Sequence, residues 1–110
     1  MSEKSCREAV YQRAEYMCER CTNVSRGLTV HHRLKRSHGG AWTVSNCVLL
    51  CGSGTTPNGC HSFCEHYPDK AATEGFHVRP WEDPAEIPVL WRGTRLVLLT
   101  DEGGFKPWGF

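Results

Sequence analysis

The order of apolar and polar positions predicts one helix near the start of the chain, then short strands and a second helix. Apolar residues recur at spacings of four and three over residues 4–17, which predicts an amphipathic helix. The segment "LTVHH" (28–32) is rich in β-branched residues and predicts a strand. The apolar segment "CVLLC" (47–51) is compatible with a buried strand or with the start of a helix. Residues 60–67 have a helical pattern, and we expect Pro68 to end that helix or to open another.

The C-terminal part of the chain has the pattern of short strands. Segments "FHVRPW" (76–81), "VLWR" (89–92) and "RLVLLT" (95–100) each predict a strand. The segment "TDEGGF" (100–105) has the composition of a hairpin turn.

Together these elements predict an α+β fold with an N-terminal helix and a short β-rich C-terminal extension. We expect residues 1–75 to form the core and residues 76–110 to form a β-hairpin-like extension of the same domain. A chain of 110 residues has the length of one small domain. A structural metal would help a core of that size, because little apolar surface is available to bury.

Composition indicates a cytoplasmic location and no membrane partner. The start "MSEKSCREAV" has no apolar segment of a signal peptide, and no stretch approaches the roughly 18 apolar residues of a membrane span. In a reducing compartment, the seven cysteines favour metal binding over disulfides.

Net charge is +1, but its distribution is uneven. Residues 18–40 carry five basic residues against one acidic residue, whereas residues 69–110 carry five against seven. Since phosphate affinity follows local Lys and Arg density, the first region is the candidate nucleic-acid surface. An ordinary solvated loop is the alternative interpretation.

Four cysteines form two pairs with the spacing of metal ligands: Cys18-x2-Cys21 and Cys51-x8-Cys60. Two such hairpins can hold one tetrahedral Zn²⁺ through four thiolates, so a structural zinc site is predicted. Buried free cysteines are the alternative. By their spacing from the second pair, Cys47 and Cys64 could each replace one ligand.

Histidines and a carboxylate supply a second set of candidate ligands. His31 and His32 are adjacent, and neighbouring side chains of a strand point to opposite faces. On a helix over residues 60–67, Glu65 shares a face with His61, whereas His66 lies about 140° around from it. Glu65 is therefore the better geometric partner, and His66 is the more familiar ligand type. A mixed His and carboxylate site suits Mg²⁺ or Mn²⁺.

The order Cys-x2-Cys, "VHH", "GG", "SN", "LLC" and "CH" resembles the zinc-containing HNH endonucleases, most of all small HNH proteins of phage genomes. The resemblance covers about residues 6–68, and the C-terminal extension is also similar. It implies a small zinc-stabilised ββα-metal fold that hydrolyses DNA, by nicking or double-strand cleavage, with low sequence specificity. It further implies one catalytic divalent ion (Mg²⁺, Mn²⁺ or Ni²⁺) and, in phage DNA packaging, terminase or other packaging proteins as partners.

The same resemblance implies roles for individual histidines. His31 matches the first ligand of the catalytic metal, and His32 matches the general base. His61 matches the ligand that directly follows the last zinc cysteine. The family often has another His four residues later, where this chain has Glu65, with His66 beside it as the second choice.

Asn46 matches the middle residue of the family pattern, which implies that it holds the loop and orients the base. We expect Arg33, Lys35 and Arg36 to contact DNA phosphates. A non-catalytic zinc module that binds nucleic acid or protein is the alternative function. The absence of the usual ligand at position 65 favours that alternative, and the base at position 32 argues against it.

Overall fold

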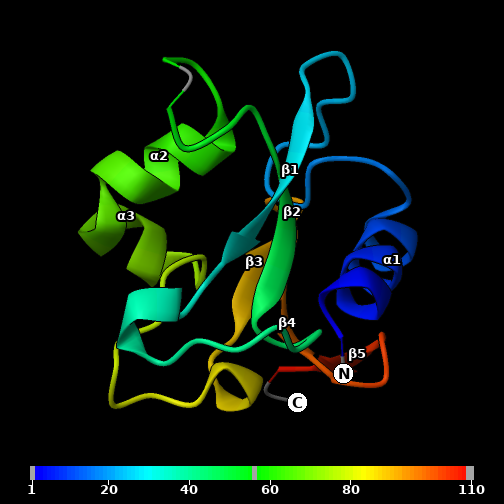
Figure 1. Cartoon of the computed structure of the whole chain (residues 1–110), viewed down its shortest axis with the longest axis vertical. Coiled ribbons are helices and arrows are strands. Elements are labelled where there is room, and N and C mark those ends of the chain that lie inside the picture. The colour runs from blue at the N-terminus through cyan, green and yellow to red at the C-terminus, as the bar shows by residue number, and fades with distance from the viewer. Residues whose placement is uncertain (1, 56, 109–110) are drawn as a thin grey trace.

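A central pair of strands lies between the N-terminal helix and two further helices. The structure, a computed structural model, describes residues 2–55 and 57–108. Figure 1 shows α1 on one side of the β1–β2 pair and α2 with α3 on the other. The helices and antiparallel sheets confirm the predicted α+β class.

The N-terminal helix α1 spans Glu3–Ala14 and packs against β2. Ser2 caps it by accepting a hydrogen bond from the helix backbone at 3.1 Å. The helix ends before residue 17, where the pattern predicted its end. Glu15 and Tyr16 adopt left-handed backbone conformations, with φ of 55° and 59°, and this turns the chain out of the helix.

Strands β1 (Leu28–His32) and β2 (Cys47–Cys51) form an antiparallel pair in which His32 lies opposite Cys47. The strand predicted at 28–32 is therefore confirmed. The 47–51 segment is a strand and not a helix start, and every one of its residues is buried. Its uniform apolar character follows from contact with α1 on one face and α2 on the other.

Helix α2 (Cys60–His66) follows the loop after β2, and α3 (Pro68–Thr73) follows at once. Pro68 opens α3 at its first position, where its missing N–H costs no hydrogen bond. Gly75 has a φ of 82°, and a Cβ there would lie 1.9 Å from the carbonyl oxygen of Pro88. Only glycine permits this close approach of the C-terminal segment.

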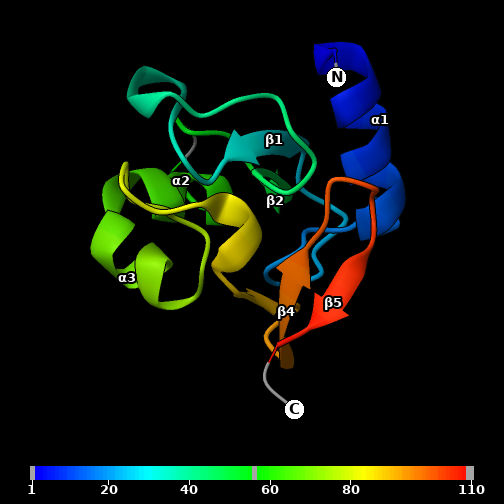
Figure 2. The same ribbon diagram turned by 90° about the horizontal axis from the view of Figure 1, so that it is seen from below.

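The C-terminal residues form the short helix η2 (Pro84–Glu86) and a three-stranded antiparallel sheet, seen from below in Figure 2. Its strands are β3 (Val89–Trp91), β4 (Arg95–Leu99) and β5 (Phe105–Pro107), in that order.

The strand predicted at 76–81 does not form, so that prediction is wrong. The backbone N–H of Val78 donates to Arg33 O at 2.8 Å, and that of Arg79 donates to the Glu82 carboxylate at 2.9 Å. Pro80 has no N–H at all. The N–H groups of Val78 and Arg79 therefore make tertiary hydrogen bonds and do not pair with a neighbouring strand.

The C-terminal sheet shares its core with the rest of the chain. One cluster of buried residues combines β2, α2 and the cysteine loop (residues 18–21) with β3 and β4. Trp91 donates from Nε1 to Glu19 Oε2 at 2.8 Å, and Arg13 pairs with Glu19 at 2.7 Å, with both side chains fully buried. The division of the chain at residue 75 stays a prediction.

Within the part of the chain that the structure describes, no helix is long and apolar enough to cross a membrane.

Candidate metal centres and active site

The four predicted zinc ligands converge. The Sγ atoms of Cys18, Cys21, Cys51 and Cys60 all lie within 4.8 Å of one another, and none of these cysteines is in a disulfide. Backbone N–H groups point at two of the sulfurs: Cys21 N lies 3.5 Å from Cys18 Sγ, and Cys60 N lies 3.4 Å from Cys51 Sγ. Such bonds favour the thiolate over the thiol. The donor set therefore fits Zn²⁺, and the cluster could hold that ion.

Cys47 and Cys64 lie outside this cluster. Both are buried in the core, and burial raises the pKa of the Cys64 thiol to about 12. Neither belongs to the four-sulfur cluster, so both are core side chains in this structure.

Two of the basic residues in the 18–40 region contact sulfur atoms of the cysteine cluster. Arg20 Nη1 lies 3.4 Å from Cys60 Sγ, and Arg26 Nη1 lies 3.8 Å from Cys51 Sγ. Arg20 also makes a bidentate ion pair with Glu74, at 2.8 and 3.1 Å. The positive charge of this region is thus partly balanced by thiolates and by Glu74, and less of it is available to a nucleic acid.

His31, His61 and Glu65 form the second cluster, whose ligand atoms lie within 4.8 Å of one another. Glu65 Oε1 is 3.4 Å from His31 Nδ1 and 3.7 Å from His61 Nε2. His31 comes from β1, while His61 and Glu65 occupy one face of α2 at the predicted spacing of four residues.

Each histidine of this cluster is oriented by its other ring nitrogen. His31 Nε2 donates to the carbonyl oxygen of Phe76 at 2.9 Å, so Nδ1 is the ring nitrogen that faces Glu65. Thr29 gives its hydroxyl proton to Gly52 O, so Thr29 Oγ1 accepts from His61 Nδ1 at 2.6 Å. The Nε2 lone pair of His61 then faces Glu65 as well. A hydrogen bond that fixes the second nitrogen is characteristic of metal-binding histidines.

Two members of the cluster have the protonation states that a divalent cation requires. A hydrogen bond from His31 lowers the pKa of Glu65 to about 2, so the carboxylate is charged, and a bound cation would take the place of that proton on Nδ1 of His31. Burial lowers the pKa of His61 to about 4, so the imidazole is neutral at pH 7. The N and O donors fit Mg²⁺ or Mn²⁺.

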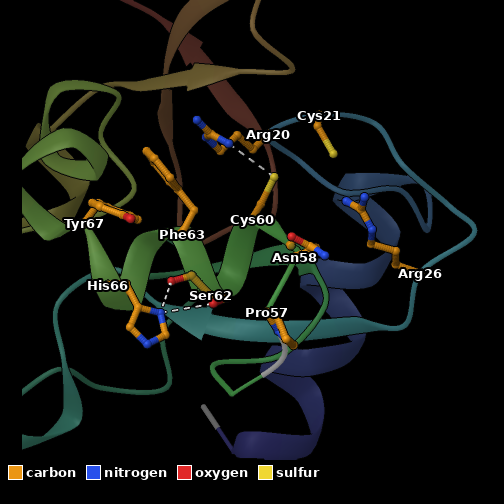
Figure 3. Close-up of a pocket in the computed structure, with 11 residues that line it drawn as sticks. Arg20, Cys21, Arg26, Pro57, Asn58, Cys60, Ser62, Phe63, His66 and Tyr67 are labelled. Carbon is orange, nitrogen blue, oxygen red and sulfur yellow. Dashed lines mark hydrogen bonds between the residues drawn. The ribbon is translucent and has the colours of Figure 1, made fainter.

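His66 is separated from this cluster. It is exposed, and its Nδ1 lies 2.9 Å from Ser62 O and 3.1 Å from Ser62 Oγ. Figure 3 shows it in a different place, an open groove of about 840 Å³ between α2 and the cysteine loop, with Phe63 and Tyr67 beside it. Of the two candidate third ligands, only Glu65 is in position.

His32 lines the same cavity of about 310 Å³ as His31, His61 and Glu65. The two adjacent histidines therefore reach one cavity at the end of β1. The His32 ring packs edge-on against Trp42, with centroids 4.4 Å apart, and its buried Nε2 has no hydrogen-bond partner among the described residues. Burial lowers the pKa of His32, so the imidazole is neutral at pH 7.

Asn46 closes the loop between β1 and β2. Its Oδ1 accepts from Leu34 N at 2.8 Å, and its Nδ2 donates to Leu34 O at 3.1 Å and Ala41 O at 3.2 Å. The Asn46 side chain makes no hydrogen bond to His32 in the described structure, and its contacts are with the loop that carries Trp42. In the same loop a Cβ on Gly40 would lie 1.7 Å from Leu34 O, which explains the glycine there.

Arg33 is not a phosphate contact, and this prediction is wrong. Its side chain is fully buried. It donates to four carbonyl oxygens at 2.6 to 2.9 Å: Ser45, Gly75, Pro84 and Ile87. Side chains alternate between the two faces of β1, and residue 33 lies two positions after buried His31. Continuing this alternation past the end of the strand would have indicated that Arg33 is buried. Lys35 and Arg36 do line the cavity.

Three groups at the site lacked a predicted role. Thr29 stands two residues before His31 in β1, so the strand period could have indicated it. Trp42 and the carbonyl of Phe76 gave no signal, because their contacts join segments distant in sequence.

The fold and the site define a small α+β protein with a four-cysteine cluster and a His/Glu cluster where a β-hairpin meets a helix. Residues 18–53 match the family model for HNH endonuclease, which confirms the predicted resemblance for that segment. This family comprises nucleases that act on DNA and use a divalent metal ion. Comparisons with curated proteins and with solved structures gave no match. The matched segment includes His31, His32 and Asn46 and ends before α2.

Proposed function

We propose that this protein is an endonuclease that hydrolyses phosphodiester bonds in DNA with a divalent metal ion. The observation that carries the proposal is the convergence of His31, His61 and Glu65, whose ligand atoms lie within 4.8 Å of one another at the cavity that His32 also lines. In His31 and His61 one ring nitrogen is held by a hydrogen bond and the other faces Glu65. Side chains with a purely structural role would not need this arrangement.

In this proposal His31, His61 and Glu65 hold the divalent ion, which would be Mg²⁺, Mn²⁺ or Ni²⁺. When bound, such an ion neutralises charge on the scissile phosphate and stabilises the departing oxygen. Thr29 and the Phe76 carbonyl keep the two imidazoles in the ligating orientation.

His32 acts as the general base in this proposal. Its depressed pKa keeps it neutral near pH 7, and Nε2 is free of hydrogen bonds to the described residues. Nε2 is buried, whereas Nδ1 is not among the buried unpaired atoms of the described residues, so Nδ1 is the ring nitrogen that can take the proton of a water in the cavity. General-base catalysis of this kind contributes about 10²- to 10⁴-fold.

Lys35 and Arg36 are the proposed phosphate contacts. Lys35 Nζ lies 4.0 Å from Glu65 Oε2, and the Arg36 side chain is exposed at the same cavity. Both can bind the phosphates that flank the scissile bond.

Zn²⁺ in the four-cysteine cluster is the proposed structural element of residues 1–75, with residues 76–110 completing the same domain. Reduced thiolates are required for this site, so a cytoplasmic location belongs to the proposal. If the chain is phage-encoded, terminase or other packaging proteins are the proposed partners, on the family likeness alone.

Incubation with supercoiled plasmid tests the activity. We expect the protein to nick or linearise plasmid with at least one of Mg²⁺, Mn²⁺ and Ni²⁺, and His32→Ala to lose this activity. His38→Ala, a change of an exposed histidine in the same loop, is the matched control and should retain it. Equal nicking by the wild type and His32→Ala would refute the assignment of the base.

The alternative is a zinc module that binds nucleic acid or protein without cleaving it. One observation favours it, because the segment that matches the family model ends at residue 53, before the candidate metal ligands His61 and Glu65. Under this alternative the wild type binds DNA or a protein partner but leaves plasmid intact in all three metal ions.

A further inference from the structure

Arg20 lies in the cysteine loop, between the candidate zinc ligands Cys18 and Cys21, and its side chain reaches a third ligand. Its Nη1 donates to Cys60 Sγ at 3.4 Å, and Figure 3 shows the guanidinium directed at that sulfur. Only 25% of the Arg20 side chain is exposed. A donor of this kind acts on the ligand atom and not on the ion, so its effect depends on how firmly the donor is held.

Two further side chains hold the Arg20 guanidinium in place. Glu74 accepts from Nε at 2.8 Å and from Nη2 at 3.1 Å, a bidentate ion pair. Cζ of Arg20 lies 4.1 Å from the centroid of the Phe63 ring, within the range of a cation–π contact. With Nε and Nη2 engaged by the carboxylate, Nη1 is the nitrogen that points at Cys60. The hydrogen bond to sulfur is therefore preorganised.

The side chains that hold Arg20 belong to two helices. Cys60 and Phe63 lie one turn apart in α2, and Glu74 is the residue at which α3 ends. The backbone carbonyl of Glu74 accepts from Leu90 N at 2.8 Å, so the position of this carboxylate is itself fixed by the C-terminal segment. The guanidinium thus joins the cysteine loop to α2 and to the end of α3.

A cationic donor suits the cysteine cluster once the cluster holds zinc. Four thiolates exceed the charge of one Zn²⁺ by two, and three of the four cysteines are buried. A charged N–H that donates to a thiolate stabilises the thiolate against protonation, and a ligand must be deprotonated to keep its metal. Contacts of this outer kind contribute about 10- to 100-fold to metal affinity.

Arg26 provides a comparison at the same cluster. Its Nη1 lies 3.8 Å from Cys51 Sγ, its side chain is exposed, and it makes no ion pair within the described part of the chain. Arg20 and Arg26 carry the same charge and differ in their distance from sulfur and in how firmly they are held. A difference between their effects therefore measures position and not charge alone.

We propose that Arg20 is a positioning residue of the zinc site, which donates to the Cys60 thiolate and thereby slows the loss of the ion. This rests on the proposed structural zinc. One of the basic residues of the 18–40 region then acts on a metal ligand and not on a nucleic acid.

Zn²⁺ and Co²⁺ binding tests the proposal, because the charge-transfer absorption of Co²⁺–thiolate bonds reports on the sulfur ligands. We expect Arg20→Ala to weaken the affinity for both ions about 10- to 100-fold in competition with a chromogenic chelator. The charge-transfer band should move to longer wavelength, since a thiolate without its hydrogen bond is a better electron donor. Arg26→Ala removes the same charge and should change the affinity less than about fivefold, with the band in place.

Two further variants separate an action on the ligand from a role in the fold. If Arg20 only tied α3 to the cysteine loop, Glu74→Ala would weaken zinc binding as much as Arg20→Ala; we expect a smaller loss, because Arg20 still reaches Cys60. Arg20→Lys should be intermediate, since an ammonium group can donate to sulfur but cannot form the bidentate pair. Arg20→Lys also provides the band shift if Arg20→Ala does not fold.

An unchanged affinity or an unshifted band in Arg20→Ala would overturn the proposal, and so would equal losses in Arg20→Ala and Glu74→Ala. The band is read from metal-loaded protein, so a loss of fold does not imitate its shift. If the wild type binds both ions through thiolates and Arg20→Ala matches it, only the role of Arg20 fails. If the wild type binds neither ion, the proposed zinc site itself fails.

Discussion

Arg33→Met removes a buried cation that joins three segments of the chain. Each hydrogen bond involving a charged group contributes about 1.5 to 3 kcal/mol, so the four carbonyl contacts give about 6 to 12 kcal/mol in total. Burial lowers the pKa of Arg33, which shows that desolvation of the cation opposes these contacts. Breaking a buried charged network of this kind costs about 3 to 5 kcal/mol.

We therefore expect Arg33→Met to lower the free energy of unfolding by about 4 kcal/mol. Urea unfolding followed by circular dichroism, with saturating zinc in every sample, measures this. Arg33→Lys should be intermediate, because an ammonium group has three donors and cannot span four separated carbonyls. Arg36→Met, an exposed neighbour, is the control and should stay within about 0.5 kcal/mol of the wild type. An Arg33→Met protein within about 1 kcal/mol of the wild type would refute the reasoning.

Three further predictions concern the metal sites. Glu65→Ala should weaken Mn²⁺ binding in calorimetry while His66→Ala should not, because only Glu65 lies with the two histidines; equal effects would contradict this. Thr29→Val should lower Mn²⁺ affinity about 10- to 100-fold by releasing Nδ1 of His61, and an unchanged affinity would show that the orientation of the ring does not matter. Removing zinc with a strong chelator should abolish the far-ultraviolet dichroism of the fold, since structural zinc contributes about 10 kcal/mol; a spectrum that survives zinc loss would exclude a structural role.

The C-terminal segment takes part directly in the candidate site. The carbonyl of Phe76 orients His31, and those of Pro84 and Ile87 bind Arg33. Truncation after residue 75 would therefore leave Arg33 with unpaired donors and His31 without its orienting bond. The extension thus supports the residues on both sides of His32.

Local pattern was sufficient for the elements close to the site. The strand at 28–32 and the cysteine pairs were readable because side-chain period and ligand spacing are properties of a few consecutive residues. The preference for Glu65 over His66 followed from the 100° rotation per helical residue. These features depend on geometry within one element, so the sequence contains them directly.

Contacts between distant segments decided the rest. Arg33 looked like a phosphate contact beside Lys35 and Arg36. The period of β1 could have indicated its burial, but no local pattern shows that carbonyls from residues 75–87 bind its guanidinium. The segment 76–81 had strand composition, yet its N–H groups bind Arg33 and Glu82. A side chain's burial and a backbone donor's partner are set by whichever segment packs against them. Only the tertiary structure could therefore show which groups pair with the buried arginine.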